Sequence, residues 1–436
     1  MSEEEKNGLE NPLVIPYLTG LYLGVNAISD AYLLLDGPNC VFFRASQVEG
    51  NHDWLAELTS IDGLHRIVDT DCTTERAAAA DNRLLKERLR SLNQLEKCRL
   101  IILSAMSPVA VTGPQYDRIL REEGPFEKPV VEVPPGSLRG DWLDGYENLL
   151  LSLAEKLPLE KRPLKKHRIS LVGHLMDRHE GDARGNVAEM CRLLQELGLE
   201  VASVWLDGQG SEELKKVSSC GVIVSLPYGR QAAQALCART GARLIECELP
   251  LGVGATADWL RKIAGELGLV DRAEEIISRE MGRTMREIEF LLLKRFLHRR
   301  ALLLGNDPYF LLALEKALRE LGFVVAATAV FCHRRHLEKI PLAGVGEDKK
   351  WFVNLDLKDS SFGNEFCGQE SDVVFLNSRP LHFLRGLIKR PAFVEMGFPS
   401  FHTHFFSDSP YFGFRGILKL IERTANAMAY HSCLTE

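Results

Sequence analysis

The sequence predicts an α/β protein with three Rossmann-like domains, whose mainly parallel sheets surround a shared cleft. Short apolar runs of strand length alternate with amphipathic stretches of helix length along the whole chain. This alternation is typical of parallel sheets with right-handed crossovers. At 436 residues the chain is too long for one hydrophobic core. Its composition, 45% hydrophobic and 26% charged residues, is that of a globular protein.

The first domain is expected at residues 1–164. A helix-like apolar run precedes its first strand. Strands are predicted at 32–35, 66–71, 99–104 and 130–133, and helices at 75–93, 115–123 and 141–157. The run at 99–104 is continuously apolar, as a buried parallel strand requires. Two prolines and a Lys/Arg cluster at 158–168 predict a linker to the next domain.

The middle domain is expected at 165–270, and the C-terminal domain at 271–436 after a bridging helix. Middle-domain strands are predicted at 169–173, 200–205, 221–225 and 243–246, with helices at 185–197, 229–240 and 255–267. The bridging helix is predicted at 271–297. C-terminal strands are predicted at 301–305, 323–328, 372–376 and 392–395, with helices at 308–321 and 413–429.

Composition excludes several classes of protein. The net charge of −7 argues against nucleic-acid binding, which needs a basic face. No uncharged apolar stretch reaches about 18 residues, so neither a signal peptide nor a membrane span is predicted, and the chain is expected to be cytoplasmic. The ten cysteines form no C-x-x-C pair, which argues against a zinc ribbon or a self-contained ferredoxin-type cluster.

The turn after the first strand presents the candidate metal ligand, Cys40. Gly37 and Pro38 force a tight loop at a strand end, and open α/β sheets place ligands at such ends. Cys40 would therefore be held in a fixed position. The alternative is a buried structural thiol, since unpaired cysteine is among the most often buried residue types.

Histidines supply further candidates. His402 and His404 lie in a loop rich in aromatic and polar residues, and two imidazoles at this spacing can reach a common ligand. The alternative is a solvated or hydrogen-bonded pair. The pairs His174/His179 and His333/His336 are expected in solvated loops.

The segment Gly252-Val-Gly254 follows a strand and opens a helix, as a dinucleotide fingerprint does. Its third position is alanine, so the favoured interpretation is a turn whose helix N-terminus holds an anionic group. No phosphate-binding loop of the G-x-x-x-x-G-K-[ST] type occurs. No nucleotide is therefore expected on this chain.

Four segments carry a resemblance to a known family. They are Asp36-Gly-Pro-Asn-Cys40, Val68-Asp-Thr-Asp-Cys-Thr-Thr-Glu-Arg-Ala, Leu249-Pro-Leu-Gly-Val-Gly-Ala-Thr, and the stretch from Glu395-Met-Gly-Phe-Pro to Asn426. Together they resemble, in order, the nitrogenase component 1 family. That family includes nitrogenase molybdenum–iron protein subunits, cofactor-assembly scaffolds and dark-operative protochlorophyllide reductase subunits.

The resemblance also shows what this chain lacks. Where family members carry two further cluster cysteines, this chain has Leu21 and Ala105-Met106. Only Cys40 remains as a metal ligand, with Cys72 as a nearby substitute, and one cysteine cannot hold a cluster that takes four ligands. The resemblance therefore implies an iron–sulfur cluster shared with a homologous companion subunit. Its implied cofactor-binding residues are Gly37, Pro38, Cys40, Cys72, His402 and His404.

The function implied is that of a subunit of a nitrogenase-like oxidoreductase complex. A separate ATP-dependent iron–sulfur reductase would supply electrons, and a small molecule or a metallocofactor would be the substrate. Two alternatives stay open, namely a metallocluster assembly scaffold and a metal-free binding protein on the same fold. Neither a nucleic acid nor a membrane is an expected partner.

Overall fold

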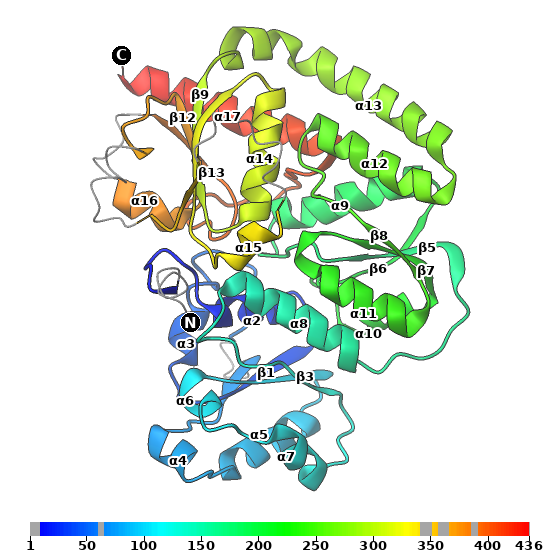
Figure 1. The fold of residues 1–436 in the computed structure, drawn as a ribbon, viewed down its shortest axis with the longest axis vertical. Helices are drawn as coiled ribbons and strands as arrows, with labels where there is room; N and C mark the ends of the chain where they lie inside the picture. Colours follow the sequence, from blue (N-terminus) through cyan, green and yellow to red (C-terminus); the bar gives the residue numbers. More distant parts are fainter. Residues whose placement is uncertain (1–8, 60–64, 341–350, 356–365, 385–390, 436) are drawn as a thin grey trace. The chain divides into compact units, whose positions relative to one another are not determined.

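The computed structural model describes residues 9–59, 65–340, 351–355, 366–384 and 391–435. These residues form three sheets, in which all the paired strands run parallel. The predicted α/β class is confirmed, and one sheet falls in each predicted domain range (Figure 1). The chain divides into two compact units, which are described separately below. None of the described helices is long and apolar enough to cross a membrane.

The first unit contains Pro16–His179 and Glu200–Glu246. Its first sheet has the order β2-β1-β3-β4, from Ile67–Asp69, Ala31–Asp36, Leu100–Ala105 and Val130–Glu132. The helices around it are α2 Tyr17–Asn26, α3 Val41–Ala45, α4 Thr74–Ala78, α5 Arg83–Gln94, α6 Ser107–Ala110, α7 Tyr116–Glu123 and α8 Trp142–Lys156. Both central strands are buried along their whole length, as their continuous apolar sequences predict.

The single helix predicted at 75–93 is wrong, because the chain breaks between α4 and α5. Ala80 has a φ of +50°, which ends α4. Asp81 accepts a hydrogen bond from the Arg83 backbone N–H at 3.2 Å. Such local side-chain bonds compete with the helix ladder and favour a new helix start.

The second sheet of this unit has the order β6-β5-β7-β8. Its strands are β5 Lys165–Val172, β6 Glu200–Val204, β7 Cys220–Ser225 and β8 Arg243–Glu246, and the helical elements between them are α10 Ser211–Lys215, η1 Lys216–Ser219, η2 Pro227–Gly229 and α11 Arg230–Thr240. The predicted linker extends too far, because β5 already begins at Lys165, which pairs with Cys220. Helix α8 contacts both α2 and α11 and so joins the two sheets.

The second unit contains Met1–Ile15, Glu180–Leu199 and Cys247–Glu436. Its sheet has the order β11-β10-β9-β12-β13, from Trp351–Val353, Val324–Val330, Arg300–Gly305, Val373–Leu376 and Ala392–Glu395. The helices are α9 Gly181–Glu196, α12 Val253–Leu267, α13 Val270–Leu291 with the π-helical turn η3 Leu292–Phe296, α14 Pro308–Glu320, α15 Arg335–Glu338, α16 Ser378–Leu384 and α17 Gly413–Thr435.

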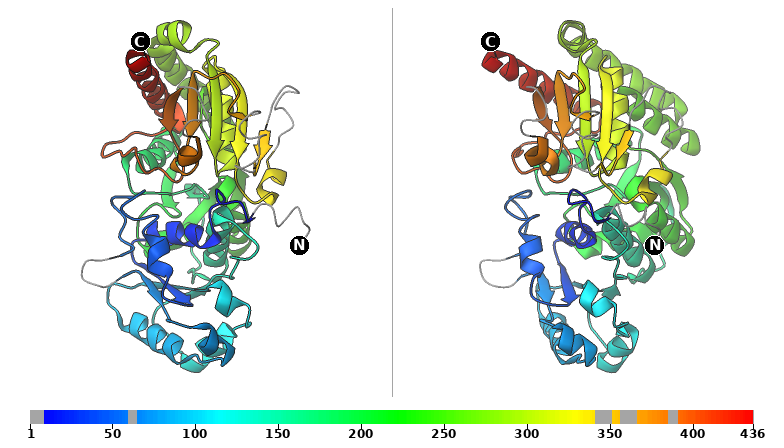
Figure 2. Two further views of the ribbon diagram at one scale, coloured as in Figure 1. Left: turned by 90° about the vertical axis from the view of Figure 1, so that its left-hand side faces the viewer. Right: turned by 60° about the vertical axis from the view of Figure 1, so that its left-hand side comes forward.

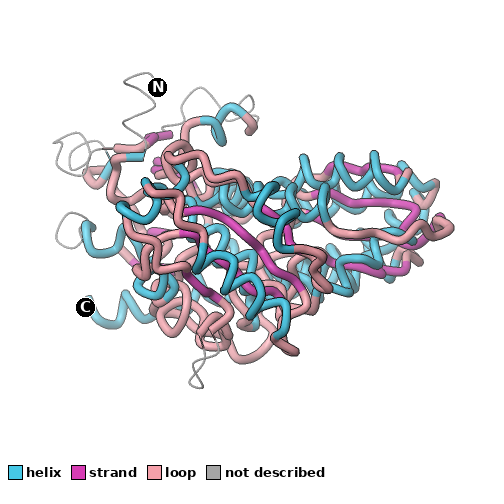
Figure 3. Tube along the Cα trace, turned by 90° about the horizontal axis from the view of Figure 1, so that it is seen from below, coloured by secondary structure: helices cyan, strands magenta, loops and turns pink. Residues whose placement is uncertain are grey.

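The strands of this sheet lie side by side, and helices of the same unit pack beside them (Figure 2). Figure 3 shows the alternation of helix and strand along the trace. Helix α9 packs closely on the loop before α17. A Cβ on Gly181 would lie 1.9 Å from the Ser407 carbonyl oxygen, so this position admits only glycine without a shift of the backbone.

Candidate functional site

The ends of three neighbouring strands hold the turn that follows β1. The Gly37 N–H donates to Thr70 Oγ1 at 3.0 Å, and the Cys72 N–H donates to the Gly37 carbonyl at 2.9 Å. The Met106 N–H donates to the Asp36 carbonyl at 3.0 Å. A Cβ on Gly37 would lie 2.7 Å from the Met106 side chain, so the turn requires glycine here. Segments far apart in the sequence therefore fix the Gly37 turn.

The two cysteines at this turn differ in exposure. Cys40 is exposed, whereas Cys72 is buried. Burial raises the pKa of the Cys72 thiol, and the charge of Asp36 raises it further. Leu21 and Ala105, where the resemblance expects two more ligands, are fully buried. The turn therefore directs one sulfur toward solvent, and the chemistry favours Cys40 over Cys72 as a thiolate ligand.

The Asp36 carboxylate, at the end of β1, bonds to two neighbouring side chains. It accepts hydrogen bonds from Thr70 Oγ1 at 2.7 Å and from the Tyr116 hydroxyl at 2.8 Å. Burial and the negative charge of Asp36 raise the pKa of Tyr116, which therefore stays a donor. A cavity of about 490 Å³ lies beside Asp36 and Cys72. The cationic side chains that line this cavity pair with nearby carboxylates, as Lys86 does with Glu122. The charges of the lining are therefore largely neutralised.

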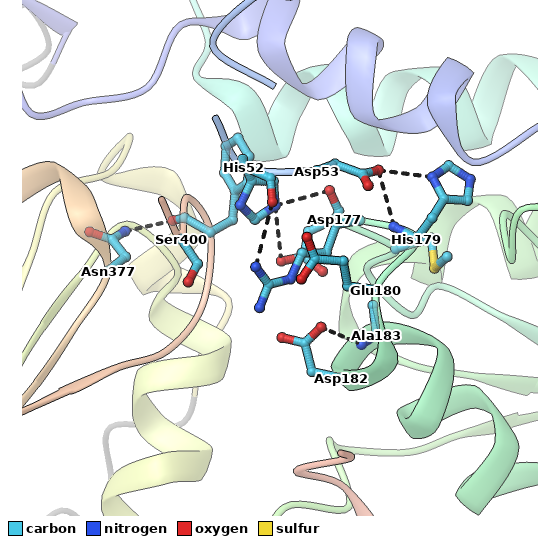
Figure 4. A network of polar contacts seen from close by, with 12 residues as sticks. His52, Asp53, Asp177, His179, Glu180, Asp182, Ala183, Asn377 and Ser400 are labelled. Atoms are coloured by element: carbon cyan, nitrogen blue, oxygen red, sulfur yellow. Dashed lines mark hydrogen bonds and ion pairs between the residues drawn. The ribbon is translucent and has the colours of Figure 1, made fainter. Parts of the chain in front are cut away.

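A pair formed by a buried carboxylate and a partly exposed imidazole lies elsewhere in the same unit (Figure 4). Asp53 Oδ2 lies 2.8 Å from His179 Nδ1, and it also accepts from the His179 backbone N–H at 3.0 Å and from Asn26 Nδ2 at 2.8 Å. Asp53 Oδ1 accepts from the Leu55 N–H at 2.9 Å. Burial alone would raise the pKa of Asp53, but these hydrogen bonds and the nearby imidazole lower it. The Asp53 carboxyl is therefore ionised.

A second histidine lies next to this pair in the sequence. His52 is fully buried, and its Nε2 lies 3.1 Å from the Asp177 carbonyl oxygen and 3.5 Å from the Asp177 carboxylate. The Arg178 guanidinium, also buried, donates to the His52 carbonyl at 3.5 Å. Residues 52–53 and 177–179 therefore form one polar network, which ties the loop after α3 to the segment after β5.

In the second unit, the two histidines predicted to share a ligand, His402 and His404, have different surroundings. His404 Nδ1 lies 2.7 Å from Glu180 Oε1, and Glu180 is fully buried. His402 is exposed, and its backbone N–H donates to Glu395 at 3.1 Å. The His404 ring is thus fixed by a carboxylate, whereas the His402 ring faces solvent. Binding of a common ligand by these two rings remains a prediction.

The prediction that the pairs His174/His179 and His333/His336 lie in solvated loops is wrong for three of the four histidines. His174 and His336 are buried, and His179 is bonded to Asp53. Burial lowers the pKa of His174 to about 4. Tertiary packing covers the rings of His174 and His336, whereas the His179 ring is held by Asp53 and stays partly exposed.

The glycine turn before α12 does hold an anionic group, as predicted. That group is the protein's own Glu320 carboxylate, which accepts from the Val253 N–H at 2.9 Å and from the Gly254 N–H at 3.2 Å. Burial raises the pKa of Glu320 more than these two bonds lower it. A Cβ on Gly254 would lie 2.5 Å from this carboxylate, which explains the second glycine.

A family model described as nitrogenase component 1 type oxidoreductase matches residues 20–429. The chain belongs to this family. The match includes both the Cys40 turn and the loop that carries His402 and His404. The resemblance seen in the four sequence segments is thereby confirmed over nearly the whole chain.

Individual relatives agree with this assignment. The nitrogenase molybdenum-iron protein beta chain of Azotobacter vinelandii is 22% identical over 402 residues, which cover 82% of this chain and 74% of that protein. A light-independent protochlorophyllide reductase subunit of Chlorobium phaeobacteroides (strain BS1) is 29% identical over 147 residues, or 32% of this chain and 26% of that protein.

A solved structure, Nitrogenase Cp1 at pH 6.5, superposes with a TM-score of 0.79 at 16% identity and covers 96% of this chain and 93% of its own. A second, Nitrogenase Cp1 at pH 5, gives a TM-score of 0.72. At these identities the superposition shows the shared fold. Three parallel sheets are therefore a property of the family fold and of this member.

Sequence reasoning missed Asp53 and Glu180 as the partners of His179 and His404. A weak signal exists, because histidine and acid stand side by side in His52-Asp53 and in His179-Glu180. Residues adjacent in sequence point away from each other too often for this signal to identify the true partners. Each partner is in fact more than a hundred residues away.

Proposed function

We propose that this chain is a subunit of a nitrogenase-like oxidoreductase complex and donates one ligand, Cys40, to an iron–sulfur cluster shared with a homologous companion subunit. A separate ATP-dependent iron–sulfur reductase supplies the electrons. The acceptor is a small molecule or a metallocofactor. Membership in an oxidoreductase family and the exposed thiol of the Gly37 turn support this proposal.

The donor set fits a shared cluster and does not fit a complete one. Iron–sulfur clusters take four thiolate ligands, and the described residues at the Gly37 turn offer one exposed sulfur. Leu21 and Ala105 are fully buried apolar residues, and Cys72 keeps its proton. In this proposal the remaining ligands come from the companion subunit. When bound, the cluster would supply one-electron redox chemistry.

Exposed apolar side chains that follow Cys40 in the sequence suit such a partner. Phe43, three residues further on in α3, is 72% exposed, and Trp54 and Leu55 on the following loop are 54% and 41% exposed. Aromatic side chains on a surface are typical anchors of protein interfaces. The chain's own contribution is to hold the turn before Cys40, through the hydrogen bonds that fix Gly37, and to exclude water when the partner covers the thiol.

The test is anaerobic co-expression of the full chain with its companion subunit, followed by iron and sulfide analysis and an EPR spectrum. Cys40→Ser should lower the iron content or shift the EPR signal of the complex. Cys433→Ser is the matched control, because Cys433 is also exposed but lies in the last helix. Cys433→Ser should leave the iron content and the spectrum unchanged.

Two outcomes would contradict the proposal, namely a complex without iron, or a Cys40→Ser complex with the iron content and spectrum of the wild type. A cluster that is present but moves intact to an apo-protein, and is not reoxidised by substrate, would instead show an assembly scaffold. Reoxidation of the reduced cluster on addition of substrate would identify an enzyme.

A further inference from the structure

The Asp53 carboxylate fixes which nitrogen of the His179 ring carries a proton. Asp53 is ionised and accepts four hydrogen bonds, so it can only accept from His179 Nδ1 at 2.8 Å. Asn26 Nδ2 also lies 3.3 Å from Nδ1, but its shorter bond, at 2.8 Å, is the one to Asp53. The Nδ1 atom must therefore donate, and in the neutral ring Nε2 carries the lone pair. Such an arrangement is found where an imidazole serves as a proton acceptor and donor.

The other ring nitrogen is open. The His179 side chain is 20% exposed, whereas Asp53 is fully buried. The ring edge with Nε2 lies against Gly208, where a Cβ would come within 3.3 Å of Nε2 and 3.2 Å of Cδ2. Gly208 has a φ of +91°, so both backbone conformation and space favour glycine. The absence of a side chain at residue 208 keeps Nε2 accessible.

Two other roles explain the geometry less well. A carboxylate–histidine pair also orients metal-binding imidazoles, but among the described residues no two further His, Cys, Asp or Glu ligand atoms gather with His179. A purely structural tether would need only the Nδ1 bond. It would not require an accessible Nε2 or a glycine beside it.

We propose that Asp53 and His179 form a proton-transfer pair, in which Asp53 positions the ring and His179 Nε2 exchanges the proton. In the donating direction the Nε2–H bond of the imidazolium breaks, and the proton goes to an acceptor that has taken up an electron. The neutral ring then takes a proton from a solvent water molecule, which leaves as hydroxide. The source of that electron rests on the proposed function, whereas the orientation of the ring does not.

The first test uses wild-type chain labelled with ¹⁵N-histidine. NMR should find His179 as the Nδ1–H tautomer when the ring is neutral. The Nε2–H tautomer would overturn the proposal. This measurement needs no variant and no cluster.

The second test is the rate of modification by diethylpyrocarbonate, which attacks a neutral imidazole nitrogen, read by peptide mass spectrometry. His179 should react. In Asp53→Asn the amide N–H₂ can donate to Nδ1 and shift the ring proton to Nε2, so the rate at His179 should fall about tenfold or more. The exposed His402 is the internal standard, and Asp177→Asn, which changes the buried carboxylate beside His52, is the matched control.

An unmodified His179 in the folded wild type, or an unchanged rate in folded Asp53→Asn, would overturn the proposal. A complex with its companion subunit allows a third test, with protons as the probe substrate: two protons and two electrons from dithionite give one H₂. His179→Gln should slow hydrogen release by roughly 10²-fold or more at unchanged iron content, and an unchanged rate would contradict the role. A wild-type complex without iron would refute the proposed function alone.

Discussion

Two carboxylate–imidazole pairs, one in each unit, have nearly the same bond and different surroundings. His179 Nδ1 lies 2.8 Å from Asp53, and His404 Nδ1 lies 2.7 Å from Glu180. Both carboxylates are fully buried. The His179 side chain is 20% exposed, whereas that of His404 is 9% exposed and its Nε2 atom is buried.

Backbone and side-chain N–H groups also bond to these carboxylates. Asp53 receives three further N–H bonds, from Asn26 and from the backbones of His179 and Leu55. Glu180 also accepts from the Phe405 N–H at 2.8 Å. We infer that the Glu180–His404 pair holds the loop before α17 on α9, whereas the Asp53–His179 pair leaves a nitrogen available for chemistry.

The largest expected effect comes from His404→Ala. Removing the imidazole breaks a buried carboxylate–imidazole pair, which costs about 3–5 kcal/mol. Because a chain with two units need not unfold in one step, the loss is best measured as hydrogen-exchange protection of amides in the 405–412 loop. The Tyr411 and Phe412 N–H groups, which bond to Asn186, are suitable reporters. Unchanged protection would show that the pair does not hold the loop.

A third imidazole sharpens the comparison because no carboxylate offsets its burial. Burial lowers the pKa of His174 from 6.5 to about 4. The unfolded chain therefore binds a proton below pH 6.5 that the folded chain does not bind until about pH 4. Above pH 6.5 the ring is neutral in both states, and its burial carries no protonation cost. As the pH falls from 6.5 to about 4, the free energy of unfolding decreases by about 3 kcal/mol.

The measurement for His174 is the midpoint of urea unfolding at pH 7 and at pH 4.5, for the wild type and for His174→Leu. The variant should lose less stability between the two pH values. Equal losses would mean that other groups cause the acid sensitivity.

The smallest expected effect comes from His179→Ala. Asp53 keeps its three N–H donors, so the cost should be about 1 kcal/mol, that of one hydrogen bond. Hydrogen-exchange protection of the Leu55 N–H measures it. A loss as large as that of His404→Ala would show that the two pairs have the same structural role, and would weaken the distinction made here.

Much of the fold was predictable, because most strands and helices have a strong local pattern. The apolar runs of β1, β3 and β9 and the amphipathic α7, α8 and α11 lie close to their predicted ranges. Elements shorter than two helical turns were missed, among them α6, α10 and α15. Such segments are too short to show a period, and their conformation depends on tertiary contacts.

The candidate site was predictable only in part. The Gly37-Pro38 turn and Cys40 follow from local chemistry, because glycine and proline restrict the backbone wherever they occur. The contacts of Cys72 and Met106 with this turn depend on strand order, which places the ends of β2 and β3 beside the end of β1. The ligand roles of Gly37, Pro38, Cys40, Cys72, His402 and His404 remain predictions.

The sequence by itself determined the α/β class, the family and the single cysteine after the Gly37 turn, because these depend on residue type and local periodicity. Only the tertiary structure decided that Cys40 is exposed and Cys72 buried, and that His179 and His404 each meet a buried carboxylate. Burial and partner choice depend on which distant segments pack together. They set the protonation state of each group, and with it the chemistry that the group can perform.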